Sequence, residues 1–225
     1  MSNRKCLVIY SRDGVPHANQ FEWQLIADYM KTPELIKKYR KNMANARMEN
    51  ILDKKSAWYR IRHQRCLIAV DGIYEHRGVN GFKNKIPYFI KLKCSPHMLL
   101  PGFFNYSPIP NPETGEMIGT FSIITGPANE VMKNIHNEGD NKHRMPRFMD
   151  PQQALRWIDE SLTDNELIEF LKYEIPSEDL EVSPVYMIRT TKHRPDGKEK
   201  FEEYAYENLP PLGNDDAPER QKSLF

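Results

Sequence analysis

The sequence has few cysteines and no long apolar run. Its cysteines, Cys6, Cys66 and Cys94, are too few and too far apart for a disulfide framework or a pair of zinc ligands. No stretch approaches the roughly eighteen residues that a membrane-spanning helix needs, and the apolar run 6–10 is too short for the core of a signal peptide. We therefore expect a protein of the reducing cytoplasm, without a membrane segment, a metal or a cofactor.

The net charge is also small. A formal charge of +1 gives no overall indication of a nucleic-acid partner. The distribution is uneven, because residues 31–65 hold eleven Lys and Arg against three acids, and residues 195–225 hold eight acids against four bases. The basic segment favours a surface that binds a polyanion, although composition alone supports a solvated, Lys-rich helix face better.

Short strands and helices are expected along the whole chain. The 225 residues suffice for one well-buried core and are few for two domains. Apolar and β-branched runs predict strands at residues 6–10, 21–26, 66–70, 87–92, 98–104, 119–125 and 182–188. Helix-start signals predict helices at residues 33–43, 128–135 and 164–171, and a further helix capped by Asp150. This order predicts an α+β fold with a mixed, mostly antiparallel sheet and inserted and flanking helices. We expect one domain over residues 1–194 and a polar, mobile tail over residues 195–225.

Three short segments contain the candidate functional residues. They are Asn45-Ala46-Arg47-Met48-Glu49, then Arg65 to Glu75, and then Thr120 to Pro146 with Ile135-His136 and Arg144-Met145-Pro146 inside it. Glu75 lies where a buried strand ends, which suits an acid or base, but a surface carboxylate paired with Arg77 or Lys85 is the more common case. His136 alone is more often structural than catalytic, and Asn45 is placed as a helix cap would be.

Together and in this order, the segments resemble the SOS response-associated peptidase (SRAP) family. The family carries Asn-Ala-Arg-x-Glu, then Cys-Leu-x-x-x-Asp-Gly followed by two aromatics and Glu, a strand ending in Ile-x-Thr, Ala-Asn, Met-x-x-Ile-His and Arg-Met-Pro. The matching stretch runs from about Val8 to Val185. The resemblance implies a single-domain SRAP-like fold and a monomeric protein of DNA damage repair and the SOS response.

The resemblance also implies a chemistry. In the family, removal of the initiator Met exposes a cysteine whose thiol and α-amine add to the aldehyde of an abasic site in single-stranded DNA. The product is a thiazolidine cross-link, and the protein is described as peptidase, hydrolase or lyase. By this resemblance Asn45 orients the terminus, Glu75 moves protons and His136 assists opening of the sugar. Arg47 contacts a phosphate, and Trp23, Tyr29 and Arg144 are expected to contact DNA.

The sequence departs from the family pattern in several places. Residue 2 is Ser2, and Cys6 falls inside an expected strand, so we expect the nucleophile to be absent from this chain. His76 follows Glu75 where the family has Trp, and residues 137–143 are additional. Whether the chain is an enzyme is therefore left open. The alternatives are a non-enzymatic single-stranded DNA-binding module that stacks bases on Trp23 or Tyr29, and an inactive, diverged relative. For Trp23, packing is favoured over stacking.

A more remote hypothesis is a metal hydrolase. It would use three side chains, His63, Glu75 and His76, as ligands. Their spacing does not resemble that of a zinc site, so the sequence favours the DNA-binding hypotheses.

Overall fold

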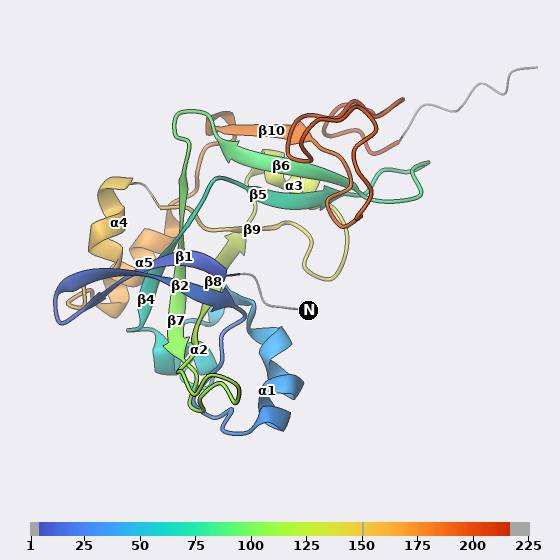
Figure 1. Ribbon diagram of the computed structural model, residues 1–225. Helices are drawn as coiled ribbons and strands as arrows, with labels where there is room; N and C mark the ends of the chain where they lie inside the picture. The colour runs from blue at the N-terminus through green and yellow to red at the C-terminus, as the bar shows by residue number, and fades with distance from the viewer. Residues whose placement is uncertain (1–4, 150, 217–225) are drawn as a thin grey trace, which may run out of the picture. The chain divides into compact units, whose positions relative to one another are not determined.

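Antiparallel strands dominate the structure, a computed structural model that describes residues 5–149 and 151–216 (Figure 1). The chain folds as two units, each assembled from separate stretches. The first contains residues 5–70, 97–126, 146–149 and 151–175, and the second contains residues 71–96, 127–145 and 176–216. The strand β9 (Arg144–Pro146) lies where the chain passes from one unit to the other.

The first unit is built on a ring of five strands. The sheet order is β2-β1-β4-β7-β8-β3, and the end of β2 also pairs in parallel with β8, which closes the ring. The strands are β1 (Lys5–Arg12), β2 (Val15–Trp23), β3 (Asn45–Arg47), β4 (Arg65–Val70), β7 (Met98–Tyr106) and β8 (Gly119–Pro127). Between β1 and β2, Asp13 and Gly14 have φ values of 54° and 72°, as a two-residue hairpin turn with matched twist requires.

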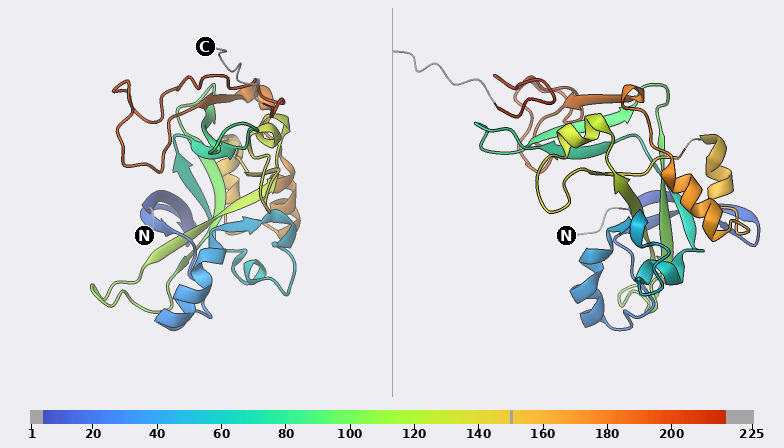
Figure 2. Two further views of the ribbon diagram at one scale, coloured as in Figure 1. Left: turned by 90° about the vertical axis from the view of Figure 1, so that its right-hand side faces the viewer. Right: turned by 180° about the vertical axis from the view of Figure 1, so that it is seen from behind.

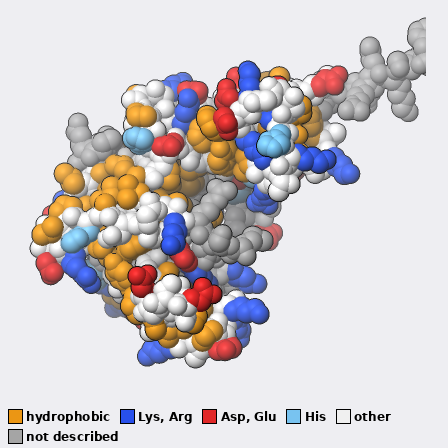
Figure 3. All heavy atoms as spheres, viewed as in Figure 1, with side chains coloured by type: hydrophobic (Ala, Val, Ile, Leu, Met, Phe, Trp, Pro, Cys, Tyr) orange, Lys and Arg blue, Asp and Glu red, His pale blue; other side chains and the backbone are white. Residues whose placement is uncertain are grey.

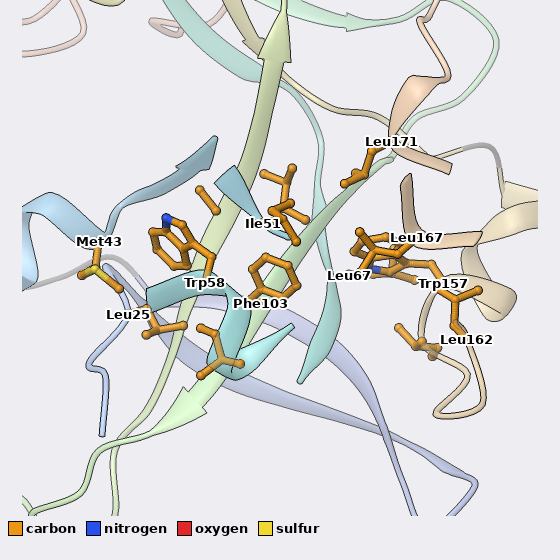
Figure 4. Packing of buried hydrophobic residues seen from close by; sticks show 14 of the residues in the cluster. Leu25, Met43, Ile51, Trp58, Leu67, Phe103, Trp157, Leu162, Leu167 and Leu171 are labelled. Atoms are coloured by element: carbon orange, nitrogen blue, oxygen red, sulfur yellow. The ribbon is translucent and has the colours of Figure 1, made fainter. Parts of the chain in front are cut away.

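Both faces of β4 are covered by side chains. On one face, Cys66 and Ile68 are buried with Tyr10 and Phe21, whose rings lie 5.6 Å apart. On the other, Leu67 joins a larger cluster that contains Phe103, Trp58 and Trp157 (Figure 4). Helices complete this cluster, namely α1 (Pro33–Tyr39), α2 (Ala57–Ile61), α4 (Pro151–Trp157) and α5 (Asp164–Lys172). The continuous apolar run of β4 therefore has the two-sided burial that such runs need.

The second unit has a three-stranded antiparallel sheet in the order β10-β6-β5. Its strands are β5 (Ile73–Arg77), β6 (Ile86–Leu92) and β10 (Leu180–Pro184). The short helix α3 (Glu130–Ile135) packs against β5, as the views from the front and from behind both show (Figures 1 and 2). This packing positions the end of α3 beside the strand that carries Glu75.

Most predicted elements are found, with changed ends. The α+β class and the mostly antiparallel sheet are confirmed. The second strand covers Val15–Trp23 instead of residues 21–26, because Gln24 has a φ of 74° and leaves the extended conformation. The helix at residues 33–43 is α-helical only to Tyr39 and continues as the 3₁₀ turn Arg40–Met43. Two more 3₁₀ turns cover Met48–Asn50 and Ser177–Asp179. The late strand covers Leu180–Pro184 instead of residues 182–188.

Two expectations fall partly outside the described residues. The helix cap at Asp150 is one, and residues 217–225 of the expected tail are the other. Within the described ranges, no helix has the length and apolar composition needed to cross a bilayer.

Candidate functional site

Strand β5 and helix α3 bring Glu75 and His136 together in the second unit. Glu75 pairs with Tyr88 in the middle of the β5–β6 ladder, and His136 caps the carboxyl end of α3. The His136 Nδ1 atom lies 3.9 Å from Glu75 Oε2, and the two side chains are 20% and 26% exposed. A carboxylate and an imidazole are therefore adjacent and accessible, which is the arrangement that general acid–base chemistry needs.

The main chain fixes the orientation of the His136 ring. Its Nδ1 lies 2.8 Å from the carbonyl oxygen of Arg144. A carbonyl oxygen can only accept a hydrogen bond, so Nδ1 carries the proton, and the Nε2 of the neutral ring is left as the acceptor. The loop 137–143 closes on itself in support of this contact, since the His143 amide donates to the His136 carbonyl at 2.8 Å. These seven residues, additional to the family pattern, return the chain so that Arg144 meets the ring.

A cavity of about 490 Å³ opens beside this pair. Positive side chains, Lys85 and Arg189, lie on its wall with Glu75 and His136, and Lys85 is paired with Glu138 at 3.1 Å. The rest of its lining is His76, Asn84, Pro87, Met187 and Ile188. The cavity can therefore hold a small polar group against an acid–base pair while cations lie beside it.

His76 is a member of this site that the sequence suggested only as a remote metal ligand. Burial lowers the pKa of its imidazole, and the nearby positive charges of Arg189 and Lys85 lower it further, whereas Glu75 opposes the shift. The ring is thus neutral at neutral pH and can donate or accept a hydrogen bond. The sequence feature that could have indicated a role for His76 in this site is its position directly after Glu75.

In the first unit, β3 presents Asn45 and Arg47 on one face. Both side chains are exposed, and Ala46 between them is buried, because neighbouring residues of a strand point to opposite faces. Asn45 pairs with Ile123 and Arg47 with Thr125 of β8. The family-like segment Asn45-Ala46-Arg47 therefore displays its two polar side chains together, and its Asn belongs to a strand and not to a helix cap.

The aromatic candidates also belong to the first unit. Trp23 is half-buried, and its indole nitrogen donates to the Ala44 carbonyl at 2.9 Å, next to Asn45. Tyr29 is 42% exposed and lies edge-on to Tyr39, with ring centres 6.0 Å apart. The half-buried position and the hydrogen bond of Trp23 fit the expectation that this side chain packs against the protein and does not stack on a base. Tyr29 is the more accessible of the two rings.

The seven predicted site residues thus divide between the units. Glu75, His136 and Arg144 belong to the second, and Asn45, Arg47, Trp23 and Tyr29 belong to the first. The main-chain carbonyl of Arg144 contacts the His136 ring, a role that no side-chain motif could indicate.

No metal centre is found among the residues that the structure describes. They contain no group of three or more His, Cys, Asp or Glu side chains placed to hold an ion. His63, one of the three ligands of the remote hypothesis, belongs to the first unit, whereas His76 and Glu75 belong to the second.

Comparison with known proteins gives a consistent result. The family described as SOS response associated peptidase (SRAP) matches residues 1–188. The abasic site processing protein YoqW of Bacillus subtilis (strain 168) is 31% identical over 183 residues, which are 81% of this chain and 75% of that protein. The abasic site processing protein HMCES of Pongo abelii is 26% identical over 164 residues, 61% of this chain and 44% of that protein.

Solved structures are similar as well. A protein from Bacteroides thetaiotaomicron superposes with a TM-score of 0.70 at 28% identity, covering 88% of this chain and 78% of that one. A protein from Bordetella bronchiseptica gives a TM-score of 0.69 at 19% identity over 83% and 86% of the two chains, which shows the fold alone.

Proposed function

The chain belongs to the SOS response associated peptidase (SRAP) family, and from this we propose that it binds single-stranded DNA at abasic sites. The observation that carries the proposal is the cavity that combines Glu75, His136 and cationic side chains. Relatives named as abasic site processing proteins support the substrate class. An abasic sugar lacks its base and can enter a cavity of this size once it leaves the stack.

Glu75 and His136 are proposed to open the abasic sugar. The ring-closed form is a hemiacetal, and it opens when the anomeric hydroxyl loses a proton, the bond between the anomeric carbon and the ring oxygen breaks, and the ring oxygen gains a proton. The His136 Nε2 takes the first proton, since its Nδ1 is held in the protonated form by Arg144. The Glu75 carboxylate, 3.9 Å from Nδ1, stabilises the imidazolium, which then returns a proton to the ring oxygen.

The first unit is proposed to contribute its own contacts to single-stranded DNA. Arg47 is exposed on β3 and suits a phosphate contact, and the half-exposed ring of Tyr29 suits base stacking. The cations of residues 31–65 add sequence-independent attraction.

Binding is the first test of this proposal. Fluorescence anisotropy with a labelled single strand is measured for three probes: one abasic site, the intact base at the same position, and the intact duplex. We expect the abasic strand to bind most tightly and the duplex least tightly. Lack of affinity for any single strand at low salt would refute the proposal. Equal affinity for abasic and intact strands would favour a non-enzymatic single-stranded DNA-binding module.

A covalent product is a separate question. Thiazolidine formation needs a thiol and a free α-amine on one residue, whereas residue 2 is Ser2 and the Cys6 nitrogen belongs to a peptide bond within β1. We therefore expect the 225-residue polypeptide to bind abasic DNA without a heat-stable shift on a denaturing gel. A shifted band that persists in both the Ser2→Ala and the Cys6→Ser variants would show that another residue is the nucleophile.

A further inference from the structure

The segment Pro210–Asp216 lies beyond the residues that the family match covers, yet it is attached to the site. We propose that Asp215 is a positioning residue that holds His136 beside Glu75. The inference about geometry stands on contacts within the second unit. Its consequence for the reaction rests on the proposed function.

One oxygen of Asp215 is bound to the strand that carries Glu75. Arg77 lies two residues after Glu75 on β5, and its side chain is fully buried. Its Nε lies 3.1 Å from Asp215 Oδ1, and its other nitrogens donate to the carbonyls of Pro210, Pro211 and Asn214 at 2.5–2.9 Å. A buried guanidinium needs such partners, so the segment is fixed to β5.

The other oxygen of Asp215 is bound to the residue that follows His136. The Asn137 Nδ2 donates to Asp215 Oδ2 at 2.9 Å and to the Gly78 carbonyl at 2.8 Å, while its Oδ1 accepts from the Gly78 amide at 2.8 Å. Gly78 is the first residue after β5. Asp215 therefore bridges the strand of Glu75 and the loop of His136.

The chemistry of the carboxylate makes this bridge directional. A carboxylate only accepts hydrogen bonds, so Asp215 reinforces the amide orientation that the two main-chain groups of Gly78 also require of Asn137. The loop after His136 lies close to the end of β5, because a Cβ added at Gly78 would lie only 2.0 Å from the Glu138 side chain. Loss of the orientation would release Asn137, the first residue of the loop, from β5, so that the His136 ring would be held less firmly beside Glu75 and against the Arg144 carbonyl.

The test uses Asp215→Asn, which keeps the shape of the side chain. Its single amide oxygen can accept from Arg77 or from Asn137, and its NH₂ group faces the remaining donor. The matched control is Asp216→Asn, since Asp216 accepts only an exposed contact from Asn80, at 2.7 Å, among the side-chain bonds that the structure describes for it. Urea unfolding confirms that each variant is folded.

The first readout is the imidazole tautomer, measured by nitrogen-15 NMR on the full chain. The His136 signal is identified among the seven histidines by its loss in His136→Gln. We expect the Nδ1-protonated form in the wild type and in Asp216→Asn, and averaging of the two tautomers in Asp215→Asn. An unchanged His136 signal in a folded Asp215→Asn variant would overturn the inference.

The second readout is the rate at which an alkoxyamine probe traps the sugar aldehyde of abasic DNA bound at saturation. We expect Asp215→Asn to lower this rate about tenfold or more while affinity stays within about threefold, since the variant loses orientation and keeps the DNA contacts. If the wild type binds no abasic DNA, the proposed function fails while the NMR result still decides the role of Asp215. A loss of affinity without a loss of rate would contradict positioning.

Discussion

At the scale of single residues, the two histidines of the cavity have different surroundings. His136 is held by a main-chain carbonyl and lies near a carboxylate, whereas His76 is affected by burial and by cations. These differences suggest different roles. His136 has the geometry to exchange protons, and His76 remains neutral at neutral pH and can form a hydrogen bond with the proposed ligand.

Removal of His136 should separate binding from sugar opening. In His136→Gln, affinity for abasic single strands should stay within about threefold, while aldehyde trapping slows about 10²- to 10⁴-fold, the range for loss of a general base. The measurement is oxime formation with an alkoxyamine at saturating protein, and His17→Gln, exposed on β2, is the control. An unchanged trapping rate would exclude His136 from the reaction.

His76 gives the protein a pH dependence of known sign. Its pKa is lower in the folded chain than the ordinary 6.5, so the unfolded chain binds more protons below that pH. Its contribution to stability is therefore fully present above pH 6.5 and is lost as pH falls through the lowered native pKa. His76→Gln removes this loss, so the wild type should lose stability relative to the variant on acidification. Urea unfolding at neutral and acidic pH measures the difference, and a gap that stays constant would show that the surroundings of His76 do not act on its charge.

At the scale of elements, β3 is a short strand that displays two of the candidate site residues. Its pairing with β8 turns Asn45 and Arg47 outward and buries Ala46. Three residues thus place a polar pair at a fixed spacing on a rigid sheet, which is the support that a binding site needs.

Arg47 should act as a phosphate contact without base preference. Arg47→Ala should weaken single-strand binding equally across sequences and reduce the slope of log affinity against log salt by about 0.7, the value for one phosphate contact. Anisotropy titrations over a salt series measure both quantities, and Arg12→Ala, at the exposed end of β1, is the control. A variant that changes sequence preference would indicate a base contact instead.

The sequence was informative about elements that local patterns specify. The apolar run of β4 and the capping box at Thr163 and Glu166 marked their elements correctly, because burial and caps are encoded within a few residues. The closure of the ring could not be predicted, since it rests on only two residue pairs, Glu22 with Thr120 and Trp23 with Phe121.

The candidate site was predicted less completely for the same reason. Motifs pointed to Glu75 and His136, and the structure brings them together. The carbonyl of Arg144, the bridge through Asp215 and the participation of His76 depend on contacts between distant segments, and no local pattern specifies them.

At the scale of the whole molecule, the net charge is only +1, although residues 31–65 carry a local excess of cations. The face in Figure 3 shows Lys and Arg interspersed with Asp and Glu, in keeping with a net charge of +1. Affinity for DNA must then come from particular contacts more than from the electrostatic field of the net charge. Recognition of the abasic sugar is therefore the central part of the proposed function.

Entry of the abasic sugar into the cavity of Glu75 and His136 can be measured directly. Nitrogen-15 imidazole spectra are recorded while unlabelled single-stranded DNA is added, once with an abasic site and once with the intact base at the same position. We expect the abasic strand to shift the His136 and His76 signals up to one equivalent, whereas the intact strand leaves both unchanged at the same occupancy. Tight binding of the abasic strand with neither signal shifted would contradict the claim that the cavity of Glu75 and His136 receives the sugar.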